Sequence, residues 1–225
     1  LGNQPLSNSL PPIGDLNQDF AFPLDFKICP HCSLGQIGEF VTPEKIFSDY
    51  TYFSSTSKSW LNHASDFAKK SYADLKLDEN DLVIEIASND GYLLQFFKHL
   101  GCKVLGIEPA ETVALRAIEI GIPTQIEFFG KECAERLVQK GAVPKLVVCN
   151  NVLAHVPDIN DFMAGLAILV NAGSTVSIEA PSLKIMLENN LFDTIYHEHF
   201  SYLSATSVLE LTSRHGIKLQ RIEML

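Results

Sequence analysis

The chain has 225 residues, of which 46% are hydrophobic, and a formal net charge of −10 at pH 7. This length allows one substantial hydrophobic core with a small appendage, and the hydrophobic content excludes a disordered chain. The acidic balance argues against nucleic-acid binding and adhesion to anionic membranes, and no apolar stretch is long enough to span a bilayer. Five cysteines, an odd number, with Cys102, Cys133 and Cys149 inside predicted strands and helices, are typical of reduced thiols in the cytoplasm.

The first 45 residues differ from the rest, because several prolines and no helical periodicity occur there. They contain Cys29-Pro30-His31-Cys32, a C-x-x-C knuckle. Two thiolates at this spacing can bind one Zn²⁺, although a structural zinc site needs four ligands. We therefore predict half of a zinc site, with Cys29 and Cys32 as ligands. The alternatives are a redox pair and two ordinary thiols.

Residues 47–60 are dense in hydroxyl and aromatic side chains, too polar for a core strand and too aromatic for a linker. They are interpreted either as a surface loop or as a lid over a polar ligand. Residues 60–75 repeat apolar side chains at helical spacing, which predicts an amphipathic helix. The acidic stretch 78–81 then predicts a turn into the first strand of the main sheet.

An apolar run at residues 82–86 ends in a turn of small and polar residues, 87–91, and a helical pattern follows at residues 93–100. This order predicts a buried parallel strand that leads through a loop into a helix N-terminus. Such a junction presents free backbone N–H groups at the positive end of a helix dipole, where a nucleotide or carboxylate can bind. Only Gly91 is a glycine, so the G-x-G-x-x-G pattern of pyrophosphate-binding turns is absent.

A second apolar run, residues 103–109, has Glu108 at its carboxyl end, where an acid can accept hydrogen bonds from both ribose hydroxyls. The acid follows the turn by roughly 20 residues, the interval of the dinucleotide fingerprint. A nucleoside without pyrophosphate satisfies both observations, and S-adenosylmethionine (SAM) is the cofactor that we predict. The alternatives are another nucleotide and a purely structural turn.

Strand and helix patterns then alternate along the chain. Strands are predicted at residues 122–129, 145–151, 174–180 and 217–225, and helices at 114–120, 130–140, 158–170 and 207–215. This rhythm predicts an α/β fold with a doubly wound, Rossmann-like parallel sheet, whose ligand lies at the carboxyl ends of the strands. Asn150 and Asn151 end one of these strands and therefore join the candidate site.

Four hydrogen-bonding side chains occupy consecutive positions at Tyr196, His197, Glu198 and His199. In a strand, Tyr196 and Glu198 share one face and the two histidines share the other, whereas in a turn Tyr196 meets His199. The block is interpreted as a general base oriented by a carboxylate, as a metal cluster, or as a satisfied polar network.

Several of these motifs together resemble the zinc-containing SAM-dependent sugar C-methyltransferases, which act on nucleotide-linked 4-keto-deoxysugars. The matching segments are residues 1–8, 29–32, 50–60, 85–91, 106–110, 155–158 and 196–200. The resemblance implies a zinc module with four cysteines, a SAM-binding core and a further C-terminal domain. Because the first cysteine pair and that last domain are absent, we expect a chain truncated at both ends. Its expected parts are a partial zinc module (1–45), a lid with a linking helix (46–80) and the methyltransferase core (81–225).

The resemblance also implies residue roles. His199 is the base that removes a proton beside the keto group, Glu198 orients it or holds a sugar hydroxyl, and Tyr196 and Tyr50 donate hydrogen bonds to the enolate oxygen. His155 is the second choice as base. Zinc is structural, and the partner is a nucleotide-linked sugar. The residues expected around SAM are Glu85, Ala87, Ser88, Asn89, Gly91, Glu108, Asn150 and Asn151.

Two other functions stay open at this point. A SAM enzyme that methylates oxygen or nitrogen on another small molecule needs the same strand ends, but no base beside an enolate. A SAM-binding fragment without catalysis is the third hypothesis.

Overall fold

The computed structural model describes residues 1–7, 20–38 and 52–224, so Tyr50 lies outside the described residues. The chain forms two compact units. One unit combines residues 1–46, 151–159 and 179–225, and the other combines residues 47–150 and 160–178. No helix within the described ranges has the length and apolarity that crossing a membrane requires.

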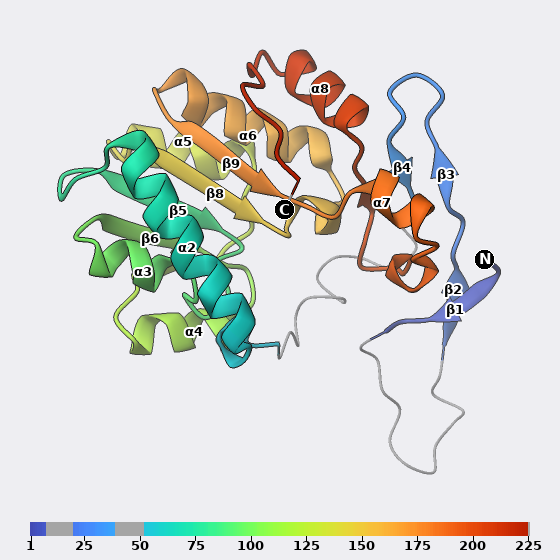
Figure 1. Cartoon of the computed structure of the whole chain (residues 1–225), viewed down its shortest axis with the longest axis horizontal. Helices are drawn as coiled ribbons and strands as arrows, with labels where there is room; N and C mark the ends of the chain where they lie inside the picture. Colours follow the sequence, from blue (N-terminus) through green and yellow to red (C-terminus); the bar gives the residue numbers. More distant parts are fainter. Residues whose placement is uncertain (8–19, 39–51, 225) are drawn as a thin grey trace, which may run out of the picture. The chain divides into compact units, whose positions relative to one another are not determined.

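The second unit is built on a five-stranded sheet with the order β7-β6-β5-β8-β9 (Figure 1). Its strands are β5 (Leu82–Ile86), β6 (Lys103–Ile107), β7 (Thr124–Gln125), β8 (Leu146–Asn150) and β9 (Thr175–Glu179). β5 pairs in parallel with both β6 and β8, and β6 pairs in parallel with β7. Chain order runs outward from β5 in one direction and resumes at β8 on its other side, which is the predicted doubly wound topology.

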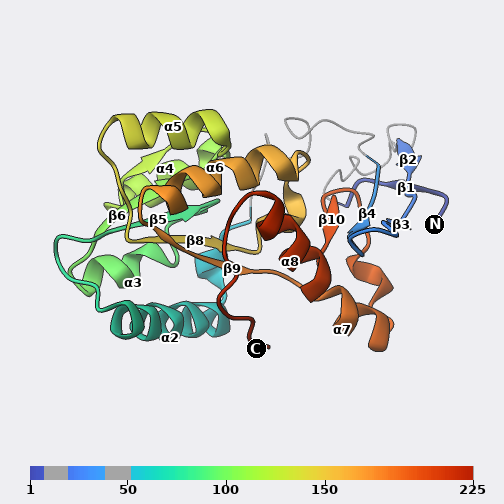
Figure 2. The same cartoon turned by 90° about the horizontal axis from the view of Figure 1, so that it is seen from above.

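Helices cover both faces of this sheet. They are α2 (Lys58–Leu75), α3 (Leu94–His99), α4 (Glu111–Glu119), α5 (Lys131–Gln139) and α6 (Ile159–Asn171). Figure 2 shows α2 and α3 on one face and α5 and α6 on the opposite face. Coverage of both faces explains why β5 and β8 consist of nearly continuous apolar residues rather than an alternating pattern.

The hydrophobic core beneath α2 and α3 fixes the position of β5. Ala64 and Ala68 of α2 are buried against Phe97 of α3 and Val83 of β5. Burial of a side chain such as Phe97 stabilises the fold by about 1.5–3 kcal/mol. The apolar spacing of residues 60–75 therefore gave the correct helix, which begins slightly earlier, after the N-cap Ser57.

Two predicted strands are wrong in extent or existence. The strand predicted at 122–129 is only Thr124–Gln125, and Ile126 and Phe128 that follow are exposed. The strand predicted at 217–225 does not form over the described residues 217–224, where Ile222 and Met224 are exposed. Apolar residues form a strand only where a neighbouring strand supplies hydrogen-bond partners, and neither segment has such a neighbour along its length.

The first unit joins the N-terminal segment to the end of the chain. β1 (Asn3–Pro5) pairs antiparallel with β2 (Ala21–Pro23), and a second sheet has the order β10-β4-β3 (Figure 2). This sheet consists of β3 (Lys27–Ile28), β4 (Gly35–Gln36) and β10 (Ser201–Tyr202). Gly35 is packed so tightly that a Cβ atom there would lie 2.9 Å from Cβ of Tyr202. The segment with the C-x-x-C knuckle thus folds onto the strand that follows His199.

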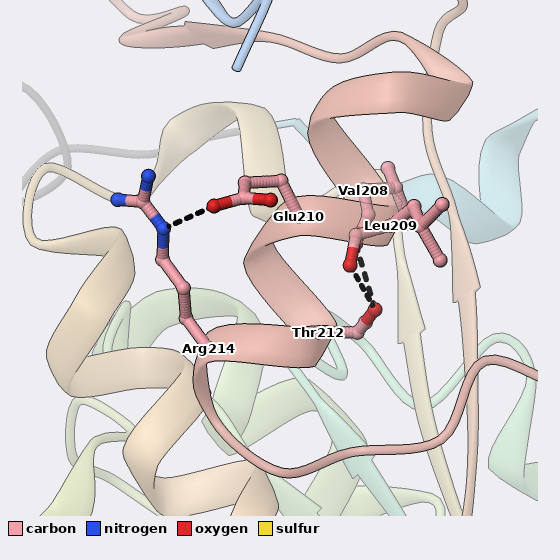
Figure 3. Close-up of polar contacts among 5 residues, drawn as sticks. All are labelled: Val208, Leu209, Glu210, Thr212 and Arg214. Carbon is pink, nitrogen blue, oxygen red and sulfur yellow. Dashed lines mark hydrogen bonds and ion pairs between the residues drawn. The ribbon is translucent and has the colours of Figure 1, made fainter. Parts of the chain in front are cut away.

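Short helices complete this unit: η3 (Leu153–His155), α7 (Leu183–Glu188), η4 (Phe192–Thr194) and α8 (Ala205–Arg214). α8 begins at a capping box formed by Ser204 and Ser207. Figure 3 shows its last turns, where the buried Thr212 hydroxyl donates to the carbonyls of Val208 and Leu209, and Arg214 pairs with Glu210 at 2.8 Å. The helix thereby satisfies its buried hydroxyl internally and keeps its charges in solvent.

Candidate functional site

The turn after β5 has a strained backbone. Ala87 and Asn89 have φ angles of 56° and 50°, in the left-handed region, and Gly91 has 78°. This conformation costs a residue such as Ala87 about 1–2 kcal/mol. The amide of Ala87 donates to the carbonyl of Ile107 at 2.8 Å, which ties the turn to the end of β6. Strain of this kind gathers at ligand sites, where the surrounding structure enforces it.

Side chains of the turn hold the segment before α2. The Asn89 amide accepts from the N–H of Ser54 at 2.9 Å and donates to the carbonyl of Tyr52 at 2.9 Å. The Asp90 carboxylate accepts from the N–H of Ser55 at 3.2 Å. These contacts hold the described residues of this segment against the turn after β5, as either a surface loop or a lid would be held.

Glu108 lies at the carboxyl end of β6 and uses both of its oxygens. Oε2 accepts from the N–H of Asn89 at 2.9 Å, and Oε1 accepts from the N–H of Ala110 at 2.8 Å. Burial raises the pKa of Glu108, while these N–H groups lower it and limit the rise. Each oxygen keeps a second lone pair, so the carboxylate can also accept from ligand hydroxyls.

Glu85 is a buried carboxyl on β5, with 1% of its surface exposed. Burial raises its pKa well above the ordinary value, and the negative charges of Glu108 and Asp90 raise it further. The Tyr92 hydroxyl and the Leu94 N–H oppose this shift only in part. Glu85 therefore holds its proton to a higher pH than a solvated glutamate does.

Four buried polar atoms at the ends of β5 and β8 have no hydrogen-bond partner. Five such side-chain atoms occur among the described residues. Four of them lie in or directly after these two strands: Glu85 Oε2, Ser88 Oγ, Asp90 Oδ1 and Asn150 Oδ1. Buried polar groups are nearly always satisfied, so a cluster of exceptions needs a cause. A polar ligand with hydroxyl and amino groups fits this donor and acceptor set, as a nucleoside cofactor does.

The structure brings together most of the residues predicted around the cofactor. Glu85, Ala87, Ser88, Asn89, Gly91, Glu108 and Asn150 all belong to the sheet unit, whereas Asn151 belongs to the other unit. There the N–H of Asn151 donates to the carbonyl of Glu179 at 2.7 Å. Sequence reasoning missed Asp90, although the residue lies within the predicted turn and is the only acid in it.

A glycine on β6 makes room for the turn. A Cβ atom at Gly106 would overlap the Ser88 hydroxyl and lie 3.0 Å from the Thr124 hydroxyl. We expect Gly106→Ala to destabilise the protein by about 1–3 kcal/mol, as overpacking of a core does, and to weaken cofactor binding by displacing Ser88. Thermal unfolding and a SAM titration measure the two effects. The double variant Gly106→Ala/Ser88→Ala should recover part of the stability, and the absence of any recovery would contradict this explanation.

A second polar cluster lies in the first unit, around the Tyr196–His199 turn. The N–H of His199 donates to the carbonyl of Tyr196 at 3.0 Å, so the block is a turn and not a strand. The Tyr196 hydroxyl meets His199 Nε2 at 3.1 Å, and His199 Nδ1 meets the carbonyl of Thr194 at 2.9 Å. A carbonyl only accepts, so Nδ1 carries the proton and Nε2 keeps a lone pair that accepts from Tyr196.

His155 lies beside His199, with their ring centroids 4.7 Å apart. Its Nδ1 donates to the backbone carbonyl of Glu198 at 2.9 Å, which leaves Nε2 with the lone pair. Burial, together with the neighbouring His199, lowers the pKa of His155 to about 4, against the raising effect of the Glu198 carbonyl. Burial also lowers the pKa of His199, although the Thr194 carbonyl and the Glu198 charge oppose this. Both imidazoles are therefore neutral at neutral pH.

Glu198 and His197 connect this turn to the N-terminal segment. The Ser7 hydroxyl donates to Glu198 Oε1 at 2.7 Å. His197 is buried, and its Nε2 donates to the carbonyl of Pro23 at 3.1 Å. The block is thus a turn held by polar contacts. In the described part of the chain, no three His, Cys, Asp or Glu side chains are grouped to hold a metal ion.

Cys29 and Cys32 lie in the turn between β3 and β4 and are free thiols. The backbone N–H groups of Cys32 and His31 are the main causes that lower the pKa of the Cys29 thiol. A stabilised thiolate is the form that binds zinc, so this donor pair fits two of the four ligands of a structural site.

Solved structures define the class of this fold. A SAM-dependent methyltransferase from Archaeoglobus fulgidus matches with a TM-score of 0.52 at 14% identity, covering 69% of this chain and 68% of that chain. Magnesium protoporphyrin IX methyltransferase from Synechocystis PCC 6803 matches with a TM-score of 0.51 at 14% identity, covering 79% and 83%. The fold is therefore the Rossmann-like fold of SAM-dependent methyltransferases.

Residues 53–222 match the family model described as "Methyltransferase domain", and the chain belongs to this family. Residues 1–47 match a model described as "Putative zinc binding domain". The C-methyltransferase NovU of Streptomyces niveus is 33% identical over 221 residues, 97% of this chain and 52% of that protein. A ubiquinone biosynthesis O-methyltransferase of Colwellia psychrerythraea is 24% identical over 150 residues, 60% of each. The chain thus spans between half and two thirds of the length of these curated relatives.

Proposed function

We propose that this chain binds SAM and catalyses C-methylation of a nucleotide-linked 4-keto-deoxysugar. Identity of 33% to a C-methyltransferase along nearly the whole chain supports the reaction class. The observation that carries the proposal is the pair of hydrogen bonds made by the His199 ring. Its Nδ1 is fixed as a donor by Thr194, and its Nε2 is a neutral base beside a phenol.

C-methylation of a ketone needs a base and a hydrogen-bond donor. A keto group acidifies the hydrogen on the neighbouring carbon, and His199 Nε2 removes this proton. The Tyr196 hydroxyl, which donates to Nε2 in the free protein, then donates to the oxygen that becomes negative. The hydrogen bond between Ser7 and Glu198 restrains a carboxylate that holds a sugar hydroxyl. His155 is the alternative base, and its lower pKa makes it the weaker one.

Bound SAM supplies an electrophilic methyl group. Glu108 accepts hydrogen bonds from the ribose hydroxyls through its remaining lone pairs, and the unpartnered atoms of Glu85, Ser88 and Asn150 face the ligand. The strained backbone at Ala87, Asn89 and Gly91 shapes the turn around it. Tyr50 keeps its predicted role as a second donor to the enolate oxygen.

Zinc takes a structural role in this proposal. Cys29 and Cys32 supply two thiolates in the β3–β4 turn, and β4 pairs with β10 directly after His199. The methyl transfer itself needs no metal, because the base and the donor are side chains.

Hydrogen exchange tests the proposal. The protein is incubated with a thymidine-diphosphate 4-keto-deoxysugar in D₂O without SAM, and NMR follows the hydrogen beside the keto group. We expect exchange at that carbon, and methylation of the same carbon when SAM is added. Methylation without any exchange, with the methyl group on oxygen, would instead favour an O-methyltransferase, the function of the second relative. SAM binding without turnover would favour the non-catalytic hypothesis.

A further inference from the structure

Three carboxyl groups are buried in the sheet unit, close enough for two of them to act electrostatically on the third. Glu85, Asp90 and Glu108 are only 1%, 2% and 5% exposed. The charges of Asp90 and Glu108 both act on Glu85, and the thiol of Cys149 on β8 also lies within its electrostatic range. Tyr92 is the remaining titratable group that acts on Glu85. No positively charged side chain of the described residues forms an ion pair with any of the three acids. Buried charges are normally paired, so this cluster lacks a cation.

The three acids differ in what they still need. Both oxygens of Glu108 accept backbone N–H groups, and burial raises the pKa of Glu85, which favours its neutral form. Asp90 has one oxygen on the N–H of Ser55, and its other oxygen, Oδ1, is buried without any partner. Among the three acids, Asp90 is therefore the one that a hydrogen-bond donor with a positive charge would satisfy.

SAM carries two cationic centres, and only one of them can satisfy Asp90. The sulfonium has no N–H or O–H group, so it cannot donate a hydrogen bond to Oδ1. The ammonium group has three donors and a full positive charge. The ribose hydroxyls are donors without charge, and Glu108 is placed for them.

We propose that Asp90 binds the ammonium group at the amino-acid end of the cofactor, so that the site selects nucleosides that carry a free amino group. This inference rests on the proposed binding of SAM. It adds a recognition residue and predicts which fragments of the cofactor the protein accepts.

Three ligands test it by calorimetric titration: SAM, S-adenosylhomocysteine and 5′-methylthioadenosine, which has no ammonium group. In Asp90→Asn, the affinity for SAM and S-adenosylhomocysteine should fall roughly 10- to 100-fold, the range of a hydrogen bond to a charged group. The affinity for 5′-methylthioadenosine should change less than about twofold. Asparagine keeps a carbonyl oxygen that can accept from the N–H of Ser55, so this hydrogen bond survives the substitution. Asp66→Asn, an exposed acid on α2, is the matched control and should alter none of the three affinities.

The other outcomes contradict the proposal in distinct ways. Equal weakening of all three ligands would show that Asp90 acts only through the Ser55 segment. Weaker binding of SAM alone would show that the carboxylate interacts with the sulfonium and not with the ammonium group. Unchanged affinity for all three ligands would show that Asp90 does not contact the cofactor. If the unmodified protein binds none of the three, the cofactor site itself is refuted, and the role of Asp90 falls with it.

Discussion

Replacement of His199 by asparagine should reduce methyl transfer by roughly 10²- to 10⁴-fold, the contribution of a general base. Asparagine can still donate a hydrogen bond to the carbonyl of Thr194, but it cannot accept a proton. SAM affinity should stay nearly unchanged, because the proposed role of His199 is to remove a proton from the substrate and not to hold the cofactor. Steady-state kinetics, hydrogen exchange beside the keto group and a SAM titration give the three measurements.

Two further variants define the base. His155→Asn should reduce the rate less than His199→Asn, since the His155 pKa of about 4 makes it the weaker base. His99→Asn, at the exposed end of α3, is the matched control and should leave the rate unchanged. A SAM affinity that collapses in His199→Asn, or exchange that persists in it, would show that the assigned role is wrong.

The same histidine sets the pH dependence. Burial lowers the pKa of His199 below 6.5, so the neutral form that accepts a proton persists to a lower pH than that of a solvated imidazole. The rate should therefore decline on the acidic side only below the ordinary histidine value. A profile of kcat/KM against pH reports the pKa of this group in the free protein. A decline that begins above pH 6.5 would contradict a neutral, buried His199.

Replacement of Glu108 by glutamine should weaken SAM binding by roughly 10- to 100-fold and also lower stability by about 1–3 kcal/mol. Both effects arise because the carboxylate oxygens each accept a backbone N–H, from Asn89 and Ala110. A glutamine amide must place its own N–H₂ group against one of these donors, which leaves a buried donor unsatisfied. Titration calorimetry and thermal unfolding measure the two effects.

A matched pair of ligands separates ribose recognition from general loss of structure. The unmodified protein should prefer 5′-methylthioadenosine over its 2′-deoxy analogue, because Glu108 accepts from the ribose hydroxyls. In Glu108→Gln this preference should shrink, whatever the change in overall affinity. An unchanged preference would place the ribose away from Glu108 and leave the residue a purely structural role.

The sequence by itself determined the elements that are longest and most buried. The apolar runs that begin at Leu82 and Lys103 became β5 (Leu82–Ile86) and β6 (Lys103–Ile107), because strands covered on both faces are largely apolar. The second strand ends two residues before the predicted end at Pro109. The single glycine of the turn and the acid at the end of the next strand then indicated a nucleoside ligand. Local pattern sufficed here, because the apolar character that burial on both faces requires is present in the runs themselves.

Only the tertiary structure decided the edges, the turns and the polar partners. The apolar run at 217–225 forms no strand over its described residues, because strand formation needs a neighbour that no local pattern encodes. The choice between a strand and a turn at Tyr196–His199 depended on the carbonyl of Thr194 and on the pairing of β10 with β4. The unpartnered oxygen of Asp90 also became visible only in three dimensions. Whether a buried polar atom has a partner is a property of its surroundings and not of its place in the chain.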